Sequence, residues 1–111
     1  MTHDHIPDPL IIGRADVTTS TPARYAKQLV AHLGRKLEFT TDGAISTAAI
    51  GAATAQIVVG TGVLTLIATG TDEEAVARAE HVLGSHLERF GQRNELTVTW
   101  ARSKGTAEAV L

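Results

Sequence analysis

The chain has 111 residues and a mass of 11.7 kDa, with ten Lys and Arg against twelve Asp and Glu, so its formal net charge is −2. It has no Cys, which excludes a disulfide scaffold, a thiol nucleophile and a thiolate metal site. The near-neutral charge argues against a nucleic-acid partner, and the lack of a long apolar run or a signal peptide argues against a membrane partner. We therefore expect one soluble domain in the cytoplasm.

The first fourteen residues predict an N-terminal arm, because two prolines and a glycine interrupt regular structure there. A single domain is expected over residues 15–102, followed by a tail over residues 103–111. Residues 15–19 predict a short strand. Thr21 and Pro22 then suit the cap and first turn of a helix that ends near Gly34. The apolar residues of this helix recur every three or four positions, as on one buried face: Ala26, Leu29, Val30, Leu33 and Leu37.

Turn residues divide the middle of the chain into four short apolar segments. Asp42-Gly43 is a strong hairpin signal, and further turns are expected at Gly51 and at Gly60-Thr61-Gly62. The segments between these turns predict strands over residues 37–41, 44–50, 54–59 and 63–69. Together they predict an antiparallel meander.

A second helix and a last strand are predicted after the meander. Thr71 and Glu74 have the spacing of a capping box, and an apolar stripe then continues to a stop at Gly91. Leu96, Val98 and Trp100 alternate with threonines, as in a half-buried strand. The order β-α-β-β-β-β-α-β predicts an α+β fold: a two-layer sandwich in which both helices cover one face of a mainly antiparallel sheet.

The other face of the sheet is expected to carry small side chains, among them Thr47, Thr54, Thr65 and Thr69. Such a face is either solvated or covered by a partner. Aromatic residues make up only 4% of the chain, and a core with few aromatics often gains burial from a second subunit. We therefore expect a homodimer.

Two of the five histidines are the main candidates for chemistry. His32 and His86 lie at the edges of the two apolar stripes, on helices that should pack side by side. Cations follow each of them along the chain: Lys36 after His32, and Arg89 and Arg93 after His86. We expect these five side chains to converge on one patch, because Arg and Lys beside imidazoles suit a bound carboxylate or phosphate.

Two other interpretations of this patch stay open. The imidazoles can be core-edge side chains bonded to a carbonyl or carboxylate, with the cations as ordinary surface charges, or one imidazole can be a general acid or base. No esterase, phosphate-loop or zinc-protease motif is present, and no cofactor is predicted. His3 and His5 could clip a metal but offer only two ligands, so no metal site is predicted, and His81 is expected on the exposed helix face.

Two segments carry a family resemblance. Residues 21–29 with His32 and Lys36, and the pattern from His86 to Trp100 (HLERFGQRNELTVTW), resemble the bacterial domain of unknown function 2218. The resemblance covers roughly residues 15–100. By position, the family's His and Lys in the first helix fall on His32 and Lys36, and its His and two Arg in the second fall on His86, Arg89 and Arg93. The chain departs from the family pattern at Leu33, Arg35 and Gln92, where an aromatic, a second His and an aromatic are usual.

The resemblance implies no assigned activity, but it implies a link to iron handling, because such domains are often encoded beside or fused to siderophore-interacting flavin reductases. The leading hypothesis is therefore a non-enzymatic accessory domain whose His/Arg/Lys patch contacts an acidic ligand or partner in iron-siderophore handling. A siderophore-interacting flavin reductase and an anionic small molecule are its expected partners. The alternatives are a small enzyme that uses His32 or His86 as general acid or base, and a purely structural interaction module.

Overall fold

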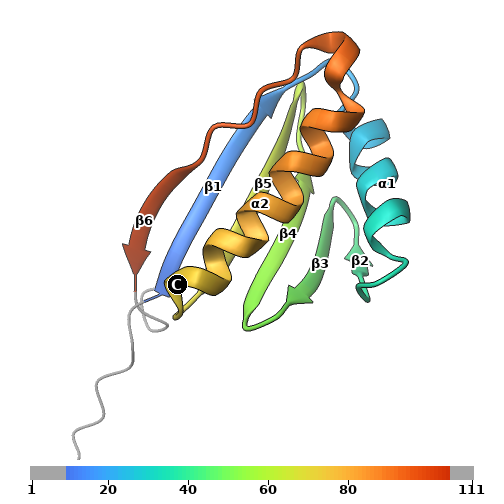
Figure 1. The fold of residues 1–111 in the computed structure, drawn as a ribbon. Coiled ribbons are helices and arrows are strands. Elements are labelled where there is room, and N and C mark those ends of the chain that lie inside the picture. Colours follow the sequence, from blue (N-terminus) through green and yellow to red (C-terminus); the bar gives the residue numbers. More distant parts are fainter. Residues whose placement is uncertain (1–9, 106–111) are drawn as a thin grey trace, which may run out of the picture.

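The computed structural model describes residues 10–105 and arranges the strands of this part of the chain in one antiparallel sheet (Figure 1). The strands are β1 (Leu10–Thr18), β2 (Thr40–Asp42), β3 (Ile45–Ile50), β4 (Ala53–Val59), β5 (Val63–Gly70) and β6 (Ala101–Gly105). Their order across the sheet is β2-β3-β4-β5-β1-β6, so β1 lies between β5 and β6. Each neighbouring pair is antiparallel, which confirms the predicted sheet and its meander.

Two turns of the meander begin with a glycine that has a positive φ. Gly43 (φ 60°) opens the turn from β2 to β3, and Gly51 (φ 59°) opens the turn from β3 to β4. Two-residue hairpin turns that match the twist of their strands need a positive φ at the first turn position, which glycine adopts without strain. The first turn therefore consists of Gly43-Ala44, one residue later than the predicted Asp42-Gly43 turn.

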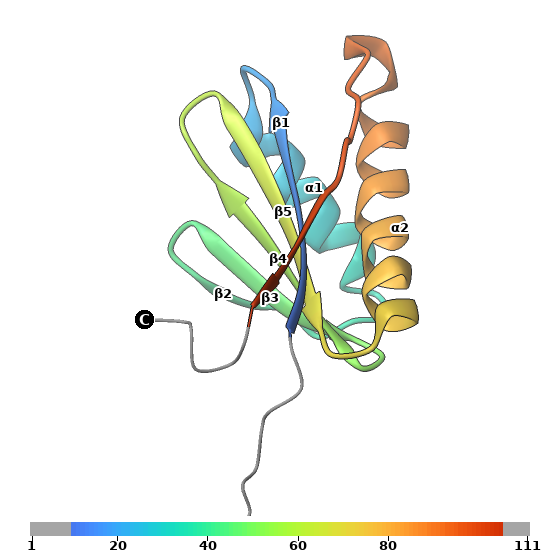
Figure 2. The same ribbon diagram turned by 90° about the vertical axis from the view of Figure 1, so that its left-hand side faces the viewer.

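Both helices cover the same face of the sheet, as predicted. The helices are α1 (Pro22–Leu33) and α2 (Glu73–Phe90), and Figure 2 shows them on one side of the strands. Their apolar stripes bury the alternate side chains of β1, β3, β4 and β5 that point to this side. The largest fully buried side chains are Leu29, Ile57, Leu64, Leu66, Val76, Leu83 and Leu87. Neither α-helix of residues 10–105 carries an apolar stretch long enough to cross a bilayer.

The start of α1 lies at the predicted residues, whereas the cap of α2 is shifted by one residue. Asp72, not Thr71, caps α2: its backbone is extended and its carboxylate accepts a hydrogen bond from the Glu74 N–H at 3.2 Å. A carboxylate at this position also meets the positive end of the helix dipole. Thr21 makes no side-chain capping bond to α1, and its N–H instead donates to Thr19 Oγ1 at 3.1 Å. The predicted helix end at Gly34 is confirmed.

The strands at one edge of the sheet reach further than predicted. Residues 10–14 of β1 pair with residues 101–105 of β6, so β1 begins inside the predicted arm and β6 extends into the predicted tail. This long-range pairing provides hydrogen-bond partners for the backbone N–H and C=O groups of residues 10–14. The local sequence around these residues, with its prolines and glycine, indicates only that regular structure is interrupted. In contrast, the strand predicted over residues 37–41 is shorter and shifted, because only Thr40–Asp42 pair with β3. Residues 1–9 and 106–111 lie outside the described part of the chain.

The predicted last strand is present but lies later in the chain, as β6. Residues 96–100, where the sequence predicts it, are not part of a strand, and we call this segment the strap. It runs from the end of α2 down to β6 (Figure 1). The Val98 N–H donates to Glu88 Oε2 on α2 at 2.9 Å, and Trp100 and Val98 pack where Gly84 has no side chain. The alternating apolar residues are therefore buried against a helix rather than across a sheet.

An ion pair fixes β6 to α2 at the end of the strap. Arg102 donates from Nε and Nη2 to the two carboxylate oxygens of Glu80, at 2.6 and 2.8 Å. Gly13 on β1 leaves the space that the Glu80 carboxylate occupies. A bidentate pair of this kind orients both side chains and holds the edge strand in register.

Candidate functional site

The two helices approach each other in antiparallel fashion and are joined at two levels. At one level, Asn94, just beyond α2, donates from Nδ2 to the Tyr25 hydroxyl at 2.6 Å. At the other, His32 in the last turn of α1 lies beside His86 of α2, with ring centroids 5.1 Å apart and ring planes tilted by 45°. The structure therefore brings together the two imidazoles that the helical spacing places at the stripe edges.

Each imidazole is held by its surroundings. His86 is half-buried, and its Nδ1 lies 2.6 Å from the carbonyl oxygen of Val82. A carbonyl oxygen can only accept, so Nδ1 carries a proton and Nε2 of the neutral ring keeps its lone pair. His32 is exposed, and it packs against Phe90 in an edge-to-face contact with centroids 5.3 Å apart.

A pocket of about 440 Å³ opens beside the two rings. Its polar lining consists of His32, His86, Arg35 and Lys36. Its apolar lining consists of Leu33, Leu37, Ile50 and Val82. No carboxylate is among these residues, so the pocket is positively charged above an apolar floor. This combination suits a small anion with an apolar body.

Three of the five predicted site residues share this pocket, and two do not. His32, His86 and Lys36 line it, whereas Arg89 lines a separate hollow together with Glu88 and other residues. Arg89 is still close enough for its charge to act on His32. Arg93 lies on the short 3₁₀ helix η1 (Gln92–Asn94), beyond the end of α2, and lines neither hollow.

Arg35 is a pocket residue that the sequence pattern places on the water-facing side of the first helix. The helix ends at Leu33, and the next residues turn, with the Lys36 N–H donating to the Leu33 carbonyl at 3.0 Å. Helical spacing therefore no longer applies at Arg35. Two features of the sequence point to Arg35: its position directly before Lys36, and its place in the family pattern, where a second His is usual. His81 is exposed as expected, and His3 and His5 lie outside the described residues.

The surroundings of His32 disfavour a proton on its ring. Partial loss of water around the ring is the largest cause that lowers the pKa of His32, followed by the positive charges of His86, Arg35 and Arg89. Two imidazoles at this separation repel each other when both are protonated. A bound anion would favour the protonated form of each ring, because its negative charge attracts the imidazolium.

The geometry gives little support to a metal centre or a catalytic relay. Within residues 10–105, no three His, Cys, Asp or Glu side chains lie close enough together to hold a metal ion. The two imidazoles are flanked by cations, which oppose a metal ion. His86 is oriented by a main-chain carbonyl, not by a carboxylate that would stabilise an imidazolium.

Comparisons with known proteins give a family and a fold. The family model described as "Uncharacterized protein conserved in bacteria (DUF2218)" matches residues 14–101. The NMR structure of PA4090 from Pseudomonas aeruginosa is similar, with a TM-score of 0.70 and 23% sequence identity over 82% of this chain and 95% of that chain. At this level of identity the similarity shows the fold alone. No curated protein matches the chain.

Proposed function

The chain belongs to this bacterial family of uncharacterised proteins, and we propose that it is a non-enzymatic module that binds an acidic ligand between α1 and α2. One observation carries the proposal: two imidazoles 5.1 Å apart border a pocket whose remaining polar side chains are both cations. A carboxylate or phosphate that enters this pocket gains charge-assisted hydrogen bonds from Arg35 and Lys36 and accepts a further one from a protonated imidazole.

The ligand class follows from the pocket. A volume of about 440 Å³ suits a small acid, and the apolar floor of Leu33, Leu37, Ile50 and Val82 suits a ligand with carbon surface. The family resemblance supports an acidic iron chelator as one such ligand, with a siderophore-interacting flavin reductase as partner in the cytoplasm. This role in iron handling rests on the family resemblance, not on the pocket.

General acid or base catalysis by His32 or His86 is the second candidate. One observation favours it: the Val82 carbonyl fixes the tautomer of His86 and leaves Nε2 free to accept a proton. The binding function is better supported, because the pocket offers several cations to hold a charge but no carboxylate to complete a relay. Turnover of a bound acid, abolished by His86→Asn, would favour the second candidate.

Calorimetric titration with citrate and with inorganic phosphate tests the proposal. Lys36→Ala should weaken binding of either probe about tenfold, the value of one charge-assisted hydrogen bond. Lys27→Ala is the matched control, because Lys27 is also exposed on the α1 side but lines a different hollow. Arg89→Ala should have a smaller effect than Lys36→Ala, since Arg89 acts on the site only through its charge.

The pH dependence gives an independent check. Binding should be tighter at about pH 6 than at about pH 8, because the anion favours the protonated imidazoles. Equal losses for Lys36→Ala and Lys27→Ala would show that only diffuse charge attracts the probes. No binding of either probe, together with unchanged His32 and His86 resonances, would overturn the proposal and leave the structural interpretation of the cluster.

A further inference from the structure

The sheet has one face that neither helix covers, which we call the open face. It consists of the side chains that alternate with the buried core residues along β1, β3, β4 and β5, together with the β6 residues in register with them. Figure 2 shows α1 and α2 on the other side of the strands. Along β3, β4 and β5 its cross-strand neighbours are small or apolar apart from Gln56, as in the pairs Ile45–Val58 and Thr54–Thr69. Ile45 is the most exposed large hydrophobic side chain of residues 10–105, with 40% of its surface exposed.

The open face has very few charges. No residue between Asp42 and Asp72 is charged, so β3, β4 and β5 contribute none. Solvated sheets and edge strands usually carry Lys and Glu side chains that keep other chains away. The central part of protein interfaces is instead depleted in charged residues. The composition of this face is therefore typical of an interface rather than of a solvated surface.

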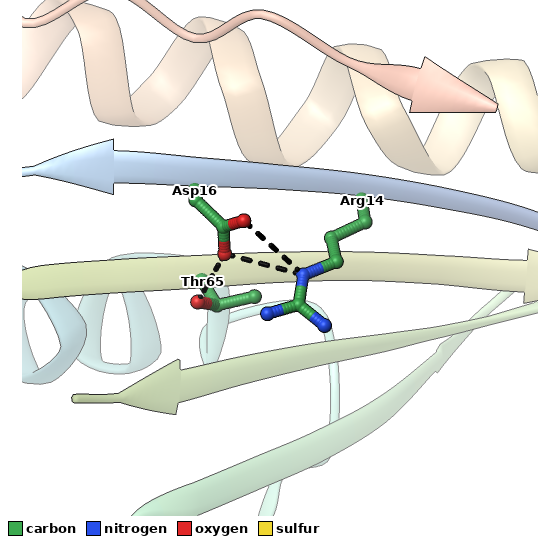
Figure 3. A network of polar contacts seen from close by, with 3 residues as sticks. All are labelled: Arg14, Asp16 and Thr65. Atoms are coloured by element: carbon green, nitrogen blue, oxygen red, sulfur yellow. Dashed lines mark hydrogen bonds and ion pairs between the residues drawn. The ribbon is translucent and has the colours of Figure 1, made fainter.

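The two charged side chains that β1 contributes to the open face neutralise each other. Arg14 donates from Nε to both Asp16 oxygens, at 3.2 and 3.3 Å, and the Thr65 hydroxyl donates to Asp16 Oδ1 at 2.7 Å (Figure 3). Thr65 is itself only 7% exposed. An isologous dimer brings a patch against its own copy, so a patch with net charge would repel itself. Here each copy presents a neutral Arg14–Asp16 pair. Across a two-fold axis, Arg14 of one copy can also pair with Asp16 of the other.

From this composition and charge we infer that the open face binds the open face of a second copy of this chain. Five adjacent strands about 4.8 Å apart and about seven residues long span roughly 24 by 23 Å, or about 550 Å² in projection. The pleated side-chain surface is larger than its projection, so it approaches the roughly 800 Å² that each partner buries in a standard interface. Small Thr, Ala and Val side chains allow two sheets to pack at about 10 Å.

This interface is independent of the anion pocket. The pocket lies between the two helices, on the opposite side of the sheet, so the dimer leaves it open to solvent. Loss of dimerisation and loss of anion binding are therefore separate outcomes. His32→Asn should leave the dimer unchanged.

Sedimentation equilibrium of the full chain tests the inference with a matched pair of substitutions. Thr54→Lys places a charge on the open face, whereas Thr97→Lys places the same charge on the strap, away from that face. The wild type and Thr97→Lys should sediment at twice the chain mass of 11.7 kDa. Thr54→Lys should weaken dimerisation at least about tenfold, because its ammonium group loses water without gaining a partner.

Far-UV circular dichroism establishes that each variant is folded, and Thr54→Glu provides a second charge at the same position if Thr54→Lys does not fold. A wild-type chain that stays monomeric at about 100 µM would overturn the inference. So would a dimer that tolerates both charges at Thr54. Loss of the dimer with Thr97→Lys but not with Thr54→Lys would place the interface on the strap instead of the open face.

Discussion

Substitution of Gly84 tests how the strap is held against α2. Gly84 is buried, and a Cβ built there would lie 3.1 Å from Trp100 Nε1 and 3.4 Å from Val98 Cγ1. An alanine methyl group therefore requires a shift of only a few tenths of an ångström. A leucine side chain extends beyond Cβ into the space that Trp100 fills, so Gly84→Leu should displace the indole.

The magnitude follows from the area that Trp100 loses. The indole is partly buried, and about 100 Å² of its surface returned to water costs about 2.5 kcal/mol at about 25 cal/mol per Å². Replacing a mid-helix glycine by leucine regains about 0.8 kcal/mol of helix propensity. Gly84→Leu should thus lower the free energy of unfolding by about 1 to 2 kcal/mol. Gly84→Ala should change it by less than about 1 kcal/mol and favour folding.

Urea unfolding followed by circular dichroism measures both changes, and fluorescence locates them. Trp100 is the only tryptophan of the chain, so native-state emission reports the strap alone. Gly84→Leu should shift this emission to longer wavelength before any unfolding, whereas Gly84→Ala should not. A leucine variant with wild-type stability and unshifted emission would refute the close packing of Trp100 on Gly84.

Three further predictions concern single side chains. The hydrogen bond from the Thr65 hydroxyl, and then Arg14, lower the pKa of Asp16. The ionised Asp16 carboxylate therefore stabilises the fold above the ordinary Asp pKa, and this stabilisation is lost as the pH falls through the lowered pKa. The urea midpoints of wild type and Asp16→Asn should therefore converge in acid. Partial loss of water around the ring, and then nearby positive charge, lower the pKa of His32. The wild type should therefore lose stability relative to His32→Asn as the pH falls through the ordinary His range, and NMR titration of the imidazole should show the lowered pKa directly. Glu80→Gln should weaken the bidentate pair with Arg102 by about 1 kcal/mol and speed amide exchange in β6 before the other strands; unchanged exchange there would contradict the role of this pair.

The helices and the meander could be predicted because their signals are local. Leu29 and Leu83 belong to apolar stripes whose period is that of a helix, and both are fully buried. Gly43 and Gly51 mark turns whose backbone geometry demands glycine. These signals require no knowledge of distant partners.

The strap could not be predicted, because alternation of Leu96, Val98 and Trp100 has two physical solutions. Such residues can be buried by a neighbouring strand or by a helix, and the choice depends on Gly84, which leaves space on α2 twelve or more positions earlier. The extension of β1 to Leu10 likewise depends on residues near the other end of the described chain. The local sequence pattern of the strap does not indicate Gly84, and that of residues 10–14 does not indicate β6.

The candidate site could be predicted only where its residues lie on regular helices. His32 and His86 lie on regular helices, so stripe geometry is enough to bring them together. Arg35 and Arg93 follow the helix ends, where the chain turns and periodicity stops. Arg35 enters the pocket at the end of α1. Arg93 does not, because the antiparallel α2 ends beside Tyr25, near the start of α1.

The place of β1 between β5 and β6 has a consequence for how the chain folds during synthesis. The hairpins of β2 to β5 join neighbouring segments and can close as soon as each turn is made. In contrast, β1 pairs with residues of β5 at least 45 positions away and with β6 still later. Because such loops close slowly and at an entropic cost, β1 leaves the ribosome before β2 to β6 but is among the last of these strands to find its place. Until then, the apolar edge of β5 is open to other chains, and its late closure by β1 is the step at which aggregation competes with folding.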